Sequence, residues 1–463
     1  MIFIEFLEKK IKIRWVLLFI LILVPSIIYL TYLVRDFYTH NRNLSKKLTN
    51  VEIFIDLITS IPKELINFYN GKHTSKALIV SKKFSKRINA SGFIYNYSIN
   101  DSLNLGYLLL NRYDGDLRMS VSELVDLKNQ KILHLWTYDV DNVWKLSKLN
   151  SHLVDFKKAS HTERARNFHT FIDNSGNIYS IFGKSPLIKN DFCSNLSIVN
   201  DDKIYHHSIE IDHEGNFWIP SYIEPKSVEL GSDKFHDDGI VKLSKDGEIL
   251  FEKSVIKILS DNGFGHLVYG TTFTDDPIHL NDIQPVMKTS QFWKKGDIFL
   301  SLRNQSIVFL YRPSSNKIIW LKQGPWHHQH DINILDDYRI SIFDNNDKLS
   351  TRRMIWGFVD GHNDTVIFNF KDNTLIRPFS STFEKLDIRT ITEGRSKLIN
   401  DDILFVEETN SGRLFIFDKH GKVLLEYINR ANDNNIYQLN WSRIISKEKG
   451  DLILKKINLV CDS

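Results

Sequence analysis

Cysteine is almost absent from this chain. The 463 residues contain two, Cys193 and Cys461, which is too few for the disulfide framework of a small secreted scaffold. An oxidising compartment could still pair them, and their spacing leaves this open. An excess of one charge is also lacking, because 60 Lys and Arg stand against 56 Asp and Glu, giving a formal net charge of +4. So small a balance does not indicate nucleic acid as a partner.

One long uncharged run lies near the N-terminus. It extends from Trp15 to Val34, between Arg14 and Arg35, and about twenty apolar residues match the hydrocarbon thickness of a bilayer. The run predicts a transmembrane anchor over 15–34, after a short tail over 1–14. Its length, and the lack of a small-residue cleavage pattern after it, favour an uncleaved anchor over a signal peptide. Basic residues stand on both sides, so charge alone does not set the orientation.

The segment after this run has the spacing of a helix. From Asn43 to Tyr69, apolar residues recur mostly at steps of three and four, with a break near Pro62. We interpret 35–75 as a helical stalk. A helix that packs on the following domain explains the same spacing equally well.

Short strand-like runs dominate the chain beyond about residue 90. They are rich in β-branched and aromatic residues and are separated by Asn, Asp, Gly and Lys turns. Turn-plus-strand units fall near residues 176, 215, 297, 337 and 402, and a propeller blade takes roughly 40 to 50 residues. No Pro-, Gly- or Ser-rich linker divides the region. The sequence therefore predicts an all-β fold over 76–463, a six-bladed β-propeller, with seven blades or a β-sandwich array as alternatives.

Four polar clusters stand where a buried strand end would normally be apolar. Three contain histidine, and the fourth places a guanidinium at the end of a strong strand. In a propeller the first strand of each blade lines the central channel, so residues far apart in sequence can meet there. The clusters are Tyr205-His206-His207-Ser208, Ile278-His279-Leu280-Asn281-Asp282, Ser301-Leu302-Arg303-Asn304-Gln305 and Trp326-His327-His328-Gln329-His330-Asp331.

The order of these clusters resembles the bacterial aryl sulfotransferase family. Members carry a His-x-Asn element followed by an Arg that ends a Ser-rich strand, which His279-Leu280-Asn281 and Arg303 match. A Gln-His element then leads into a strand ending Phe-Asp-Asn, matched by Gln329-His330 and Phe343-Asp344-Asn345. The resemblance covers most of residues 100–430. It implies a six-bladed propeller that moves a sulfuryl group between phenols through a sulfated histidine.

The resemblance assigns roles to five residues. His330 matches the nucleophile, whereas His207, His279, Asn281 and Arg303 match residues that hold the sulfuryl oxygens and the leaving phenolate. The chemistry agrees, because a neutral imidazole offers a lone pair near pH 7 and an Arg can donate two parallel bonds to sulfate oxygens. His279 is the candidate general acid and base.

The expected partners follow from the same resemblance. They are a phenolic sulfate ester as donor and a phenolic or alcohol acceptor, with no nucleotide sulfate donor, cofactor or metal. With the anchor over 15–34, the family predicts a single-pass inner-membrane protein whose propeller faces the periplasm. Well-known members are instead soluble, have a separate N-terminal β-domain, and carry a disulfide-containing insertion before the Gln-His element. Substrate identity therefore does not transfer to this chain.

Alternative interpretations of the clusters remain. A non-catalytic propeller that binds an anionic or aromatic ligand, or a partner protein, would also gather polar residues. His327, His328 and His330 suggest a metal-dependent hydrolase, although neighbouring strand residues point to opposite faces, so only His328 and His330 share a side. Arg303 could be a structural ion-pair residue. A register slip of one would exchange His206 and His207.

Overall fold

The structure is a computed structural model that describes residues 15, 18–26, 29, 78–80, 89–95, 105–149, 161–230, 235–270, 275–349 and 357–457. The chain divides into two units, Met1–Lys72 and His73–Ser463. In the first unit the described residues are helical. Within the described part of the chain, no helix combines the length and the apolar character needed to cross a bilayer. The predicted anchor over 15–34 is thus not confirmed, and the predicted tail and stalk lie outside the described residues.

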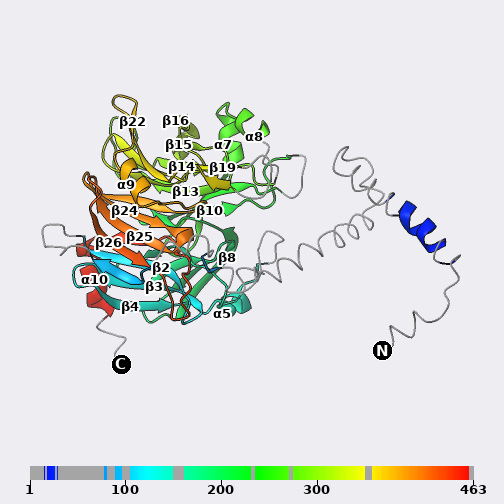
Figure 1. Ribbon diagram of the computed structural model, residues 1–463. Helices are drawn as coiled ribbons and strands as arrows, with labels where there is room; N and C mark the ends of the chain where they lie inside the picture. Colours follow the sequence, from blue (N-terminus) through cyan, green and yellow to red (C-terminus); the bar gives the residue numbers. More distant parts are fainter. Residues whose placement is uncertain are drawn as a thin grey trace, which may run out of the picture. The chain divides into compact units, whose positions relative to one another are not determined.

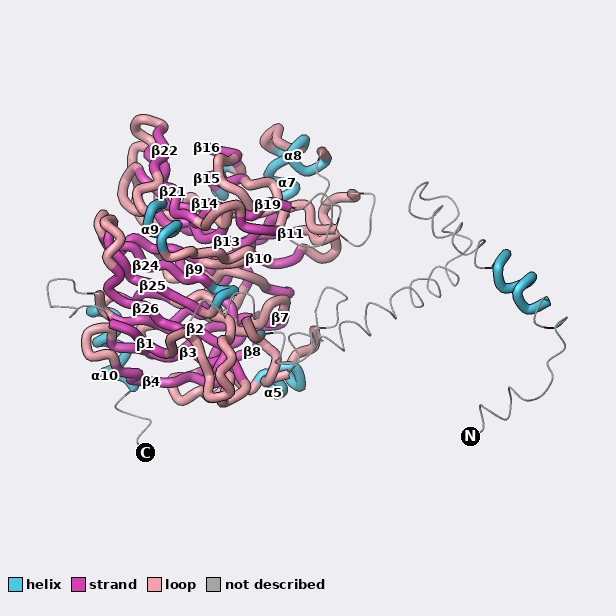
Figure 2. The backbone as a smooth tube through the Cα atoms, viewed as in Figure 1, coloured by secondary structure: helices cyan, strands magenta, loops and turns pink. Residues whose placement is uncertain are grey.

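The second unit is a propeller-like, all-β arrangement of antiparallel sheets (Figure 1). Its strands form from runs of β-branched and aromatic residues that are buried on both faces, as the uninterrupted burial of Phe217–Tyr222 and Ile298–Leu302 illustrates. Sheets of the ring lie one beside the next, and Figure 2 shows the strands of consecutive sheets side by side. Hydrophobic clusters fill the space between them, for example Ile240 against Leu300 and Phe309.

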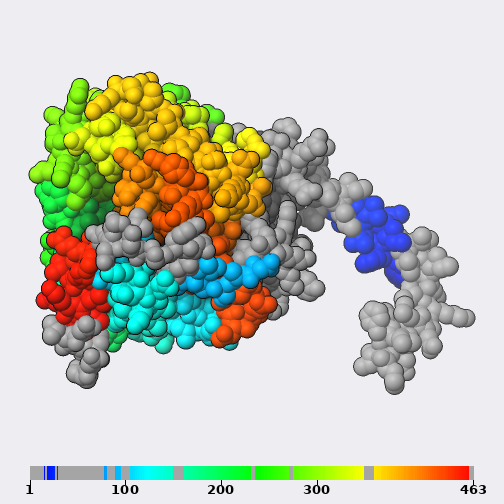
Figure 3. Space-filling model, turned by 60° about the vertical axis from the view of Figure 1, so that its left-hand side comes forward, coloured from blue at the N-terminus to red at the C-terminus, as the bar shows by residue number. Residues whose placement is uncertain are grey.

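One four-stranded sheet joins the two ends of the unit. Its order is β27-β2-β3-β4, and β27 pairs with β2 so that Ile445 lies opposite Tyr107. Figure 3 shows the C-terminal residues in red next to this N-terminal part of the ring in cyan. This pairing closes the ring with strands from opposite ends of the chain. The bounds are β2 (Tyr107–Asp114), β3 (Met119–Asp126), β4 (Lys131–Thr137) and β27 (Arg443–Ile445).

The next sheet has eight strands in the order β12-β11-β10-β8-β7-β6-β5, with β9 paired to β10. Its two halves, β5–β8 and β9–β12, are joined through the pairing of Ser221 with Tyr205. The bounds of the first half are β5 (Phe168–Ile172), β6 (Ile178–Ile181), β7 (Ser185–Asn190) and β8 (Leu196–Tyr205). Those of the second half are β9 (Glu210–Ile211), β10 (Phe217–Tyr222), β11 (Asp238–Leu243) and β12 (Ile249–Ser254).

Three further sheets and a hairpin complete the ring. One has the order β13-β14-β15-β16, with bounds β13 (Leu280–Pro285), β14 (Ile298–Leu302), β15 (Ile307–Arg312) and β16 (Lys317–Gln323). The second has the order β17-β18-β21-β22, with β17 (His330–Ile334), β18 (Arg339–Asp344), β21 (Asp364–Asn369) and β22 (Thr374–Ile376). A two-stranded hairpin consists of β19 (Asp347–Leu349) and β20 (Gly357–Val359). The third has the order β1-β26-β25-β24-β23, with β1 (Gly92–Tyr95), β23 (Arg395–Asn400), β24 (Ile403–Glu408), β25 (Arg413–Asp418) and β26 (Val423–Ile428).

Short helices connect or cover the sheets. They are α5 (Val140–Leu146), α7 (Val255–Asp261), α8 (His266–Tyr269), α9 (Ser380–Lys385) and α10 (Lys447–Ile457), with 3-10 turns η3 (Pro313–Ser315) and η4 (Thr409–Ser411). Cys193 is disulfide-bonded, and Cys461 lies outside the described residues. The predicted count of six blades is not confirmed, because two of the expected blades are hydrogen-bonded into the single eight-stranded sheet.

Side chains link four strands, β9, β13, β17 and β23. Together with β5 and β27, we call these the inner strands. The Ser208 hydroxyl accepts the Ile283 N–H at 3.2 Å, and the Asp282 carboxylate accepts the Ile332 N–H at 2.7 Å. The Asp331 carboxylate accepts the Ser396 N–H at 3.0 Å. Each link joins one inner strand to the next, so buried polar groups hold neighbouring sheets in register.

Candidate active site

Two candidate residues, and the neighbour of a third, have an unusual backbone conformation at the starts of inner strands. His207 precedes β9 with a φ of 59°, His279 precedes β13 with a φ of 53°, and Asp331 near the start of β17 has a φ of 45°. Positive φ is uncommon for residues other than glycine, and such strain is maintained at sites where the surroundings fix it. The register of β17 also shifts between His330 and Ile332, and bulges of this kind redirect side chains.

His330 is held in one tautomer by the amide of Asn345. The Asn345 Nδ2 group donates to the carbonyl oxygens of Glu393 at 2.7 Å and Thr390 at 3.2 Å, which directs Oδ1 toward the ring. Oδ1 lies 2.7 Å from His330 Nδ1. Because Oδ1 can only accept, Nδ1 carries the proton and the Nε2 lone pair is left for chemistry.

The His330 ring is also kept neutral. Burial lowers its pKa well below the ordinary histidine value, and the Arg303 charge lowers it further, against the opposing effect of Asn345. The ring is only 1% exposed. A neutral imidazole with a fixed lone pair is the form that a nucleophilic histidine needs.

One contact occupies that lone pair. The backbone N–H of Glu393 donates to His330 Nε2 at 3.2 Å, which is longer than the usual 2.9 to 3.0 Å of such bonds. Glu393 itself has a φ of 60°, and its carboxylate binds the Arg166 guanidinium at 2.7 Å. Attack by Nε2 therefore requires this turn to release the ring.

Two further histidines lie face to edge beside this position. The rings of His207 and His279 are 5.0 Å apart between centroids. Burial lowers the pKa of His207 well below its ordinary value, and the nearby His206, His279 and His330 add to the effect. His279 Nδ1 contacts the Asp276 carboxylate at 2.5 Å. The neutral His207 ring thus lies next to the His279 ring, which is paired with the Asp276 carboxylate. Histidine and carboxylate groups in such contact can transfer protons.

Arg303 reaches the site from the turn after β14. Its backbone N–H donates to the His279 carbonyl at 3.1 Å, which ties the two residues together. Its guanidinium donates to Asp347 Oδ2 at 3.1 Å, and the same oxygen lies 3.1 Å from His328 Nδ1. Arg303 Nε is buried and has no hydrogen-bond partner among the described residues. The guanidinium is therefore oriented by a carboxylate yet retains a donor for an anionic group.

Asn281 lies in a different place from the one its predicted role requires. It is fully buried at the bulge of β13, and its Nδ2 group donates to the Gln329 carbonyl at 2.7 Å. Gln329 in turn donates to the Ser301 hydroxyl at 3.0 Å and the Ile307 carbonyl at 2.9 Å. Asn281 thus fixes the backbone that leads into His330, and the structure shows no contact between Asn281 and the histidine rings.

The structure brings four predicted residues together. The His207 and His279 rings are 5.0 Å apart, the Arg303 N–H donates to the His279 carbonyl, and the His207 and His330 rings contact the same tryptophan. Sequence reasoning missed Trp441, whose ring lies 5.9 Å from His330 and 6.4 Å from His207 between centroids. Trp441 is 1% exposed, has a φ of 64°, and precedes β27. Trp441 precedes an inner strand, as His207 and His279 do. This shared position is the sequence signal that could have identified Trp441.

Metal ligation finds no support in the described part of the chain. No group of three or more His, Cys, Asp or Glu side chains there has the arrangement to hold a metal ion. His327 is exposed, whereas His328 and His330 are buried and bind Asp347 and Asn345. The histidines after Trp326 are thus divided among separate partners.

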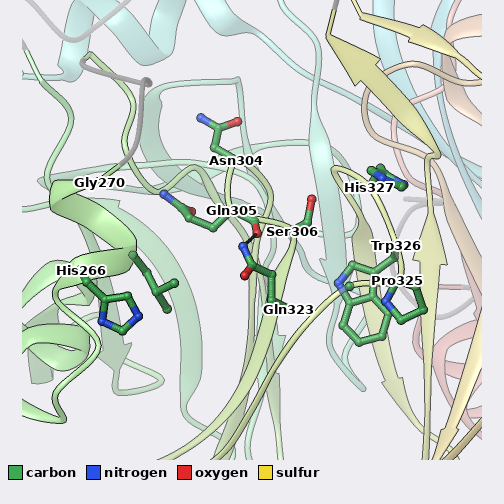
Figure 4. Close-up of a pocket in the computed structure, with 11 residues that line it drawn as sticks. His266, Gly270, Asn304, Gln305, Ser306, Gln323, Pro325, Trp326 and His327 are labelled. Carbon is green, nitrogen blue, oxygen red and sulfur yellow. Dashed lines mark hydrogen bonds between the residues drawn. The ribbon is translucent and has the colours of Figure 1, made fainter.

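A cavity of about 450 Å³ adjoins the cluster. Asn304, which follows Arg303, and His327, which precedes His328, both line it. Figure 4 shows Gln305, Ser306 and Gln323 between His266 on one side and Trp326 and His327 on the other. Both amide atoms of Gln305 are buried without a hydrogen-bond partner among the described residues. The cavity has the size of small-molecule sites, and unpaired polar atoms line it.

The family of this chain is established by a match to a protein-family model. The model described as "Arylsulfotransferase (ASST)" matches residues 170–430, more than half of the chain. The chain belongs to the arylsulfotransferase family. The match includes His207, His279, Arg303 and His330, so the cluster described above lies within the family domain.

Other comparisons say less about this arylsulfotransferase family member. No curated protein matches it. Solved structures that resemble it include a protein of unknown function from Bacteroides caccae, with 11% identity, a TM-score of 0.43, and coverage of 70% of this chain and 93% of that one. Virginiamycin B lyase from Staphylococcus aureus has 13% identity, a TM-score of 0.32 and coverage of 58% and 72%. Kuenenia stuttgartiensis hydrazine synthase has 10% identity, a TM-score of 0.35 and coverage of 80% and 88%. These scores are too low to bear on fold or function.

Proposed function

We propose that this family member moves a sulfuryl group from a phenolic sulfate ester to an acceptor hydroxyl through a sulfated His330. The observation that carries the proposal is the fixed, neutral state of His330, with Nδ1 bonded to Asn345 and Nε2 as the lone-pair nitrogen. Arg303 and His279 lie close enough to act on that ring. A buried neutral imidazole beside a guanidinium fits attack on an anionic ester.

The reaction consists of two displacements at sulfur. In the first, His330 Nε2 forms a bond to sulfur, the bond from sulfur to the phenolic oxygen breaks, and the phenolate accepts a proton from His279. In the second, the acceptor hydroxyl gives its proton to His279 while its oxygen attacks sulfur and the N–S bond breaks. Arg303 stabilises the sulfuryl oxygens in both, by analogy with loose phosphoryl transfer.

Two features support a place for the substrates. The cavity of about 450 Å³ is lined by Asn304, the residue that follows Arg303. Its size suits an aromatic ester. The Glu393 turn, whose N–H occupies His330 Nε2, is the part that must move when an ester binds. We assign the phenolic body to the cavity and the sulfate to the space between Arg303 and His330.

The setting of the domain is also part of the proposal. We propose six blades, because the halves of the eight-stranded sheet each have four strands and meet through Ser221 and Tyr205. The uncharged run over 15–34 supports attachment to the inner membrane. The disulfide at Cys193 supports an oxidising compartment such as the periplasm.

Turnover of p-nitrophenyl sulfate with a phenol acceptor tests the proposal. The wild-type protein should release nitrophenol in an acceptor-dependent manner, and His330→Ala should reduce kcat by about a thousandfold or more. His420→Ala is the matched control, because His420 is exposed in the turn before β26 and does not line the cavity, and it should retain activity. No nitrophenol release by the wild type, with several acceptors, would contradict the proposal.

A second candidate is a non-catalytic propeller that binds an anion. The bond from Glu393 to His330 Nε2 favours it, because a lone pair that is permanently occupied cannot attack. On this hypothesis sulfate esters bind without turnover, and His330→Ala leaves binding unchanged. The same pair of variants thus separates the two functions.

A further inference from the structure

A second cavity lies further along the inner strands, away from the His330 cluster. His169 near the start of β5 is in ring contact with Trp441 before β27, whereas the last residues of both strands, Ile172 and Ile445, line this cavity. We call it the distal cavity. Its volume is about 270 Å³, and its lining residues are Phe171, Ile172, Arg395, Lys397, Phe405, Ser442, Arg443, Ile444, Ile445, Ser446 and Lys449.

The charges that line the distal cavity have one sign. They are those of Arg395, Lys397, Arg443 and Lys449, and no Asp or Glu is among the lining residues. Behind the wall, Asp331 binds Arg395 at 2.8 Å and Glu210 binds Arg443 at 2.9 Å. These pairs offset the two guanidinium groups, whereas neither ammonium group forms an ion pair among the described residues. Such an arrangement attracts an anion.

Arg395 differs from Arg443 in its hydrogen bonds. Arg443 donates to Thr170, Glu210 and Ile209 oxygens at 3.0, 2.9 and 2.6 Å, so all three of its nitrogen atoms are engaged. Arg395 is 5% exposed, yet its Nε and Nη1 atoms are buried without a hydrogen-bond partner among the described residues. Buried polar groups are normally paired. Arg395 therefore keeps two donors that no described residue satisfies.

Lys449 is held at the cavity wall. Its Nζ donates to the Ile172 carbonyl at 2.6 Å and lies 4.7 Å from the centre of the Phe171 ring. An ammonium group has three donors, so this contact uses one. Burial and the charge of Arg443 lower the pKa of Lys449 to about 8, against the opposing effects of Asp173 and Glu210. An anion nearby would raise that pKa again.

The other walls are apolar. Phe171, Phe405 and Ile445 line the cavity beside the cationic groups. A dry cavity of about 150 Å³ is enough for benzene, so about 270 Å³ has room for an aromatic ring with one charged head. The combination selects against inorganic ions, which cannot use the apolar walls, and against neutral rings, which cannot use the cations.

We propose that the distal cavity is a second binding site, separate from the His330 cluster, for an organic oxyanion: a carboxylate, sulfonate or sulfate on an aromatic or aliphatic body. The head is placed among Arg395, Lys397 and Lys449, and the body lies against Phe171 and Phe405. The site is separate from sulfuryl transfer, because among the described residues none that lines the cavity forms a hydrogen bond or ring contact with His330.

Titration calorimetry of the full chain at pH 8 tests this site with four probes. Benzoate and benzenesulfonate carry both the head and the body, benzamide is the neutral counterpart, and acetate carries a head without the ring. The test variant carries both Lys397→Gln and Lys449→Gln. The control variant carries Lys257→Gln and Lys295→Gln, which remove the same charge from two exposed lysines. Thermal unfolding of each variant establishes that it is folded.

One ring anion should bind per chain, about tenfold or more tightly than benzamide or acetate. The Lys397→Gln and Lys449→Gln pair should weaken that binding about tenfold, whereas the control pair should weaken it by less than about twofold. The Lys397→Gln and Lys449→Gln pair should leave turnover of p-nitrophenyl sulfate unchanged. Binding by the wild type at pH 8 should take up protons, because an anion raises the lowered pKa of Lys449, and Lys449→Gln should reduce this uptake.

Three results would overturn the site: no binding of either ring anion, equal binding of benzamide or acetate, or ring-anion binding that the Lys397→Gln and Lys449→Gln pair leaves unchanged. Equal binding of benzoate and benzenesulfonate indicates a general oxyanion site, and a preference identifies the head group. Binding is measured without turnover, so a failure here is distinct from a failure of sulfuryl transfer.

Discussion

Two buried polar regions lie on the same inner strands and are built differently. At the strand starts, the neutral rings of His207 and His330 contact His206 and Asn345, and His330 also accepts the Glu393 N–H. Further along, Arg395 and Arg443 are charged groups paired with Asp331 and Glu210. In the first region the rings of His207 and His330 are neutral, whereas in the second both guanidinium groups are bound by carboxylates.

The difference separates chemistry from scaffolding. Neutral histidines with lowered pKa can accept a bond or a proton near pH 7 without breaking an ion pair. The carboxylates of Asp282 and Asp331 instead accept backbone N–H groups of the next inner strand, so they contribute to joining the sheets. We therefore expect substitutions in the first region to affect turnover and those in the second to affect stability.

The largest effect expected on stability comes from Arg395→Met. It leaves the Asp331 carboxylate buried without its 2.8 Å partner, and breaking a buried pair costs about 3 to 5 kcal/mol. Urea unfolding at pH 7 measures the loss. Arg389→Met is the control, because the Arg389–Asp387 pair is exposed and is worth about 1 kcal/mol or less. Equal losses in the two variants would remove the distinction between scaffold and surface.

Arg303→Lys should act mainly on turnover. Lysine keeps the positive charge but cannot reproduce the planar fork that orients sulfuryl oxygens, so kcat/KM should fall about a hundredfold, equivalent to roughly 2.7 kcal/mol. The free energy of unfolding should change far less. Arg339→Lys, at the start of β18 and paired with Asp336, should leave kcat/KM unchanged. An Arg303→Lys protein with normal kcat/KM but lowered stability would place Arg303 in the scaffold.

Asp282→Asn should change how stability depends on pH. Burial, with Asp331 and Glu210 nearby, raises the pKa of Asp282 to about 7. Because the folded-state pKa lies above the unfolded value, the carboxyl favours folding most at low pH, and that contribution falls as pH rises from about 4 to 7. Relative to wild type, the Asn variant should therefore gain stability across this window, by up to about 1.4 kcal/mol per pH unit. Urea unfolding at pH 5 and pH 8 measures the gain, and a difference that is constant with pH would contradict it.

Asn345→Ala should give the smallest effect. Without Oδ1 the His330 tautomer is no longer fixed, so a fraction of the rings presents Nε2–H rather than a lone pair, and kcat should fall about tenfold. The pH–rate profile adds an independent measure, because Asn345 opposes the lowering of the His330 pKa. Its loss should shift the acid limb to lower pH. An unchanged profile and kcat would show that Asn345 only supports the turn.

The sequence predicted the four residues that meet at the site, because repeated turn-plus-strand units place the starts of inner strands together. It could not predict the direction of Asn281, since a bulge in β13 aims it at the Gln329 carbonyl. Trp441 was missed because β27 is only three residues long and gives a weak pattern. The occupied lone pair of His330 depends on a turn 63 residues later, and no local signal reports such a contact.

The strand pattern predicted the all-β class but not the way the sheets join. The pairing of Ser221 with Tyr205 merges strands that the spacing assigns to separate blades. Similarly, the links from Ser208 to Ile283 and from Asp282 to Ile332 use residues that appear in the sequence only as polar interruptions. Long-range hydrogen bonds of this kind depend on the closed ring and not on local propensity.

A sulfated His330 can be detected by intact-mass analysis of the protein after mixing with p-nitrophenyl sulfate, without an acceptor. The wild-type chain should gain the mass of one sulfuryl group, peptide mapping should place it on His330, and adding a phenol should remove it. His330→Ala should gain nothing. Turnover without any transient gain in mass, or a sulfuryl group on another residue, would contradict transfer through His330.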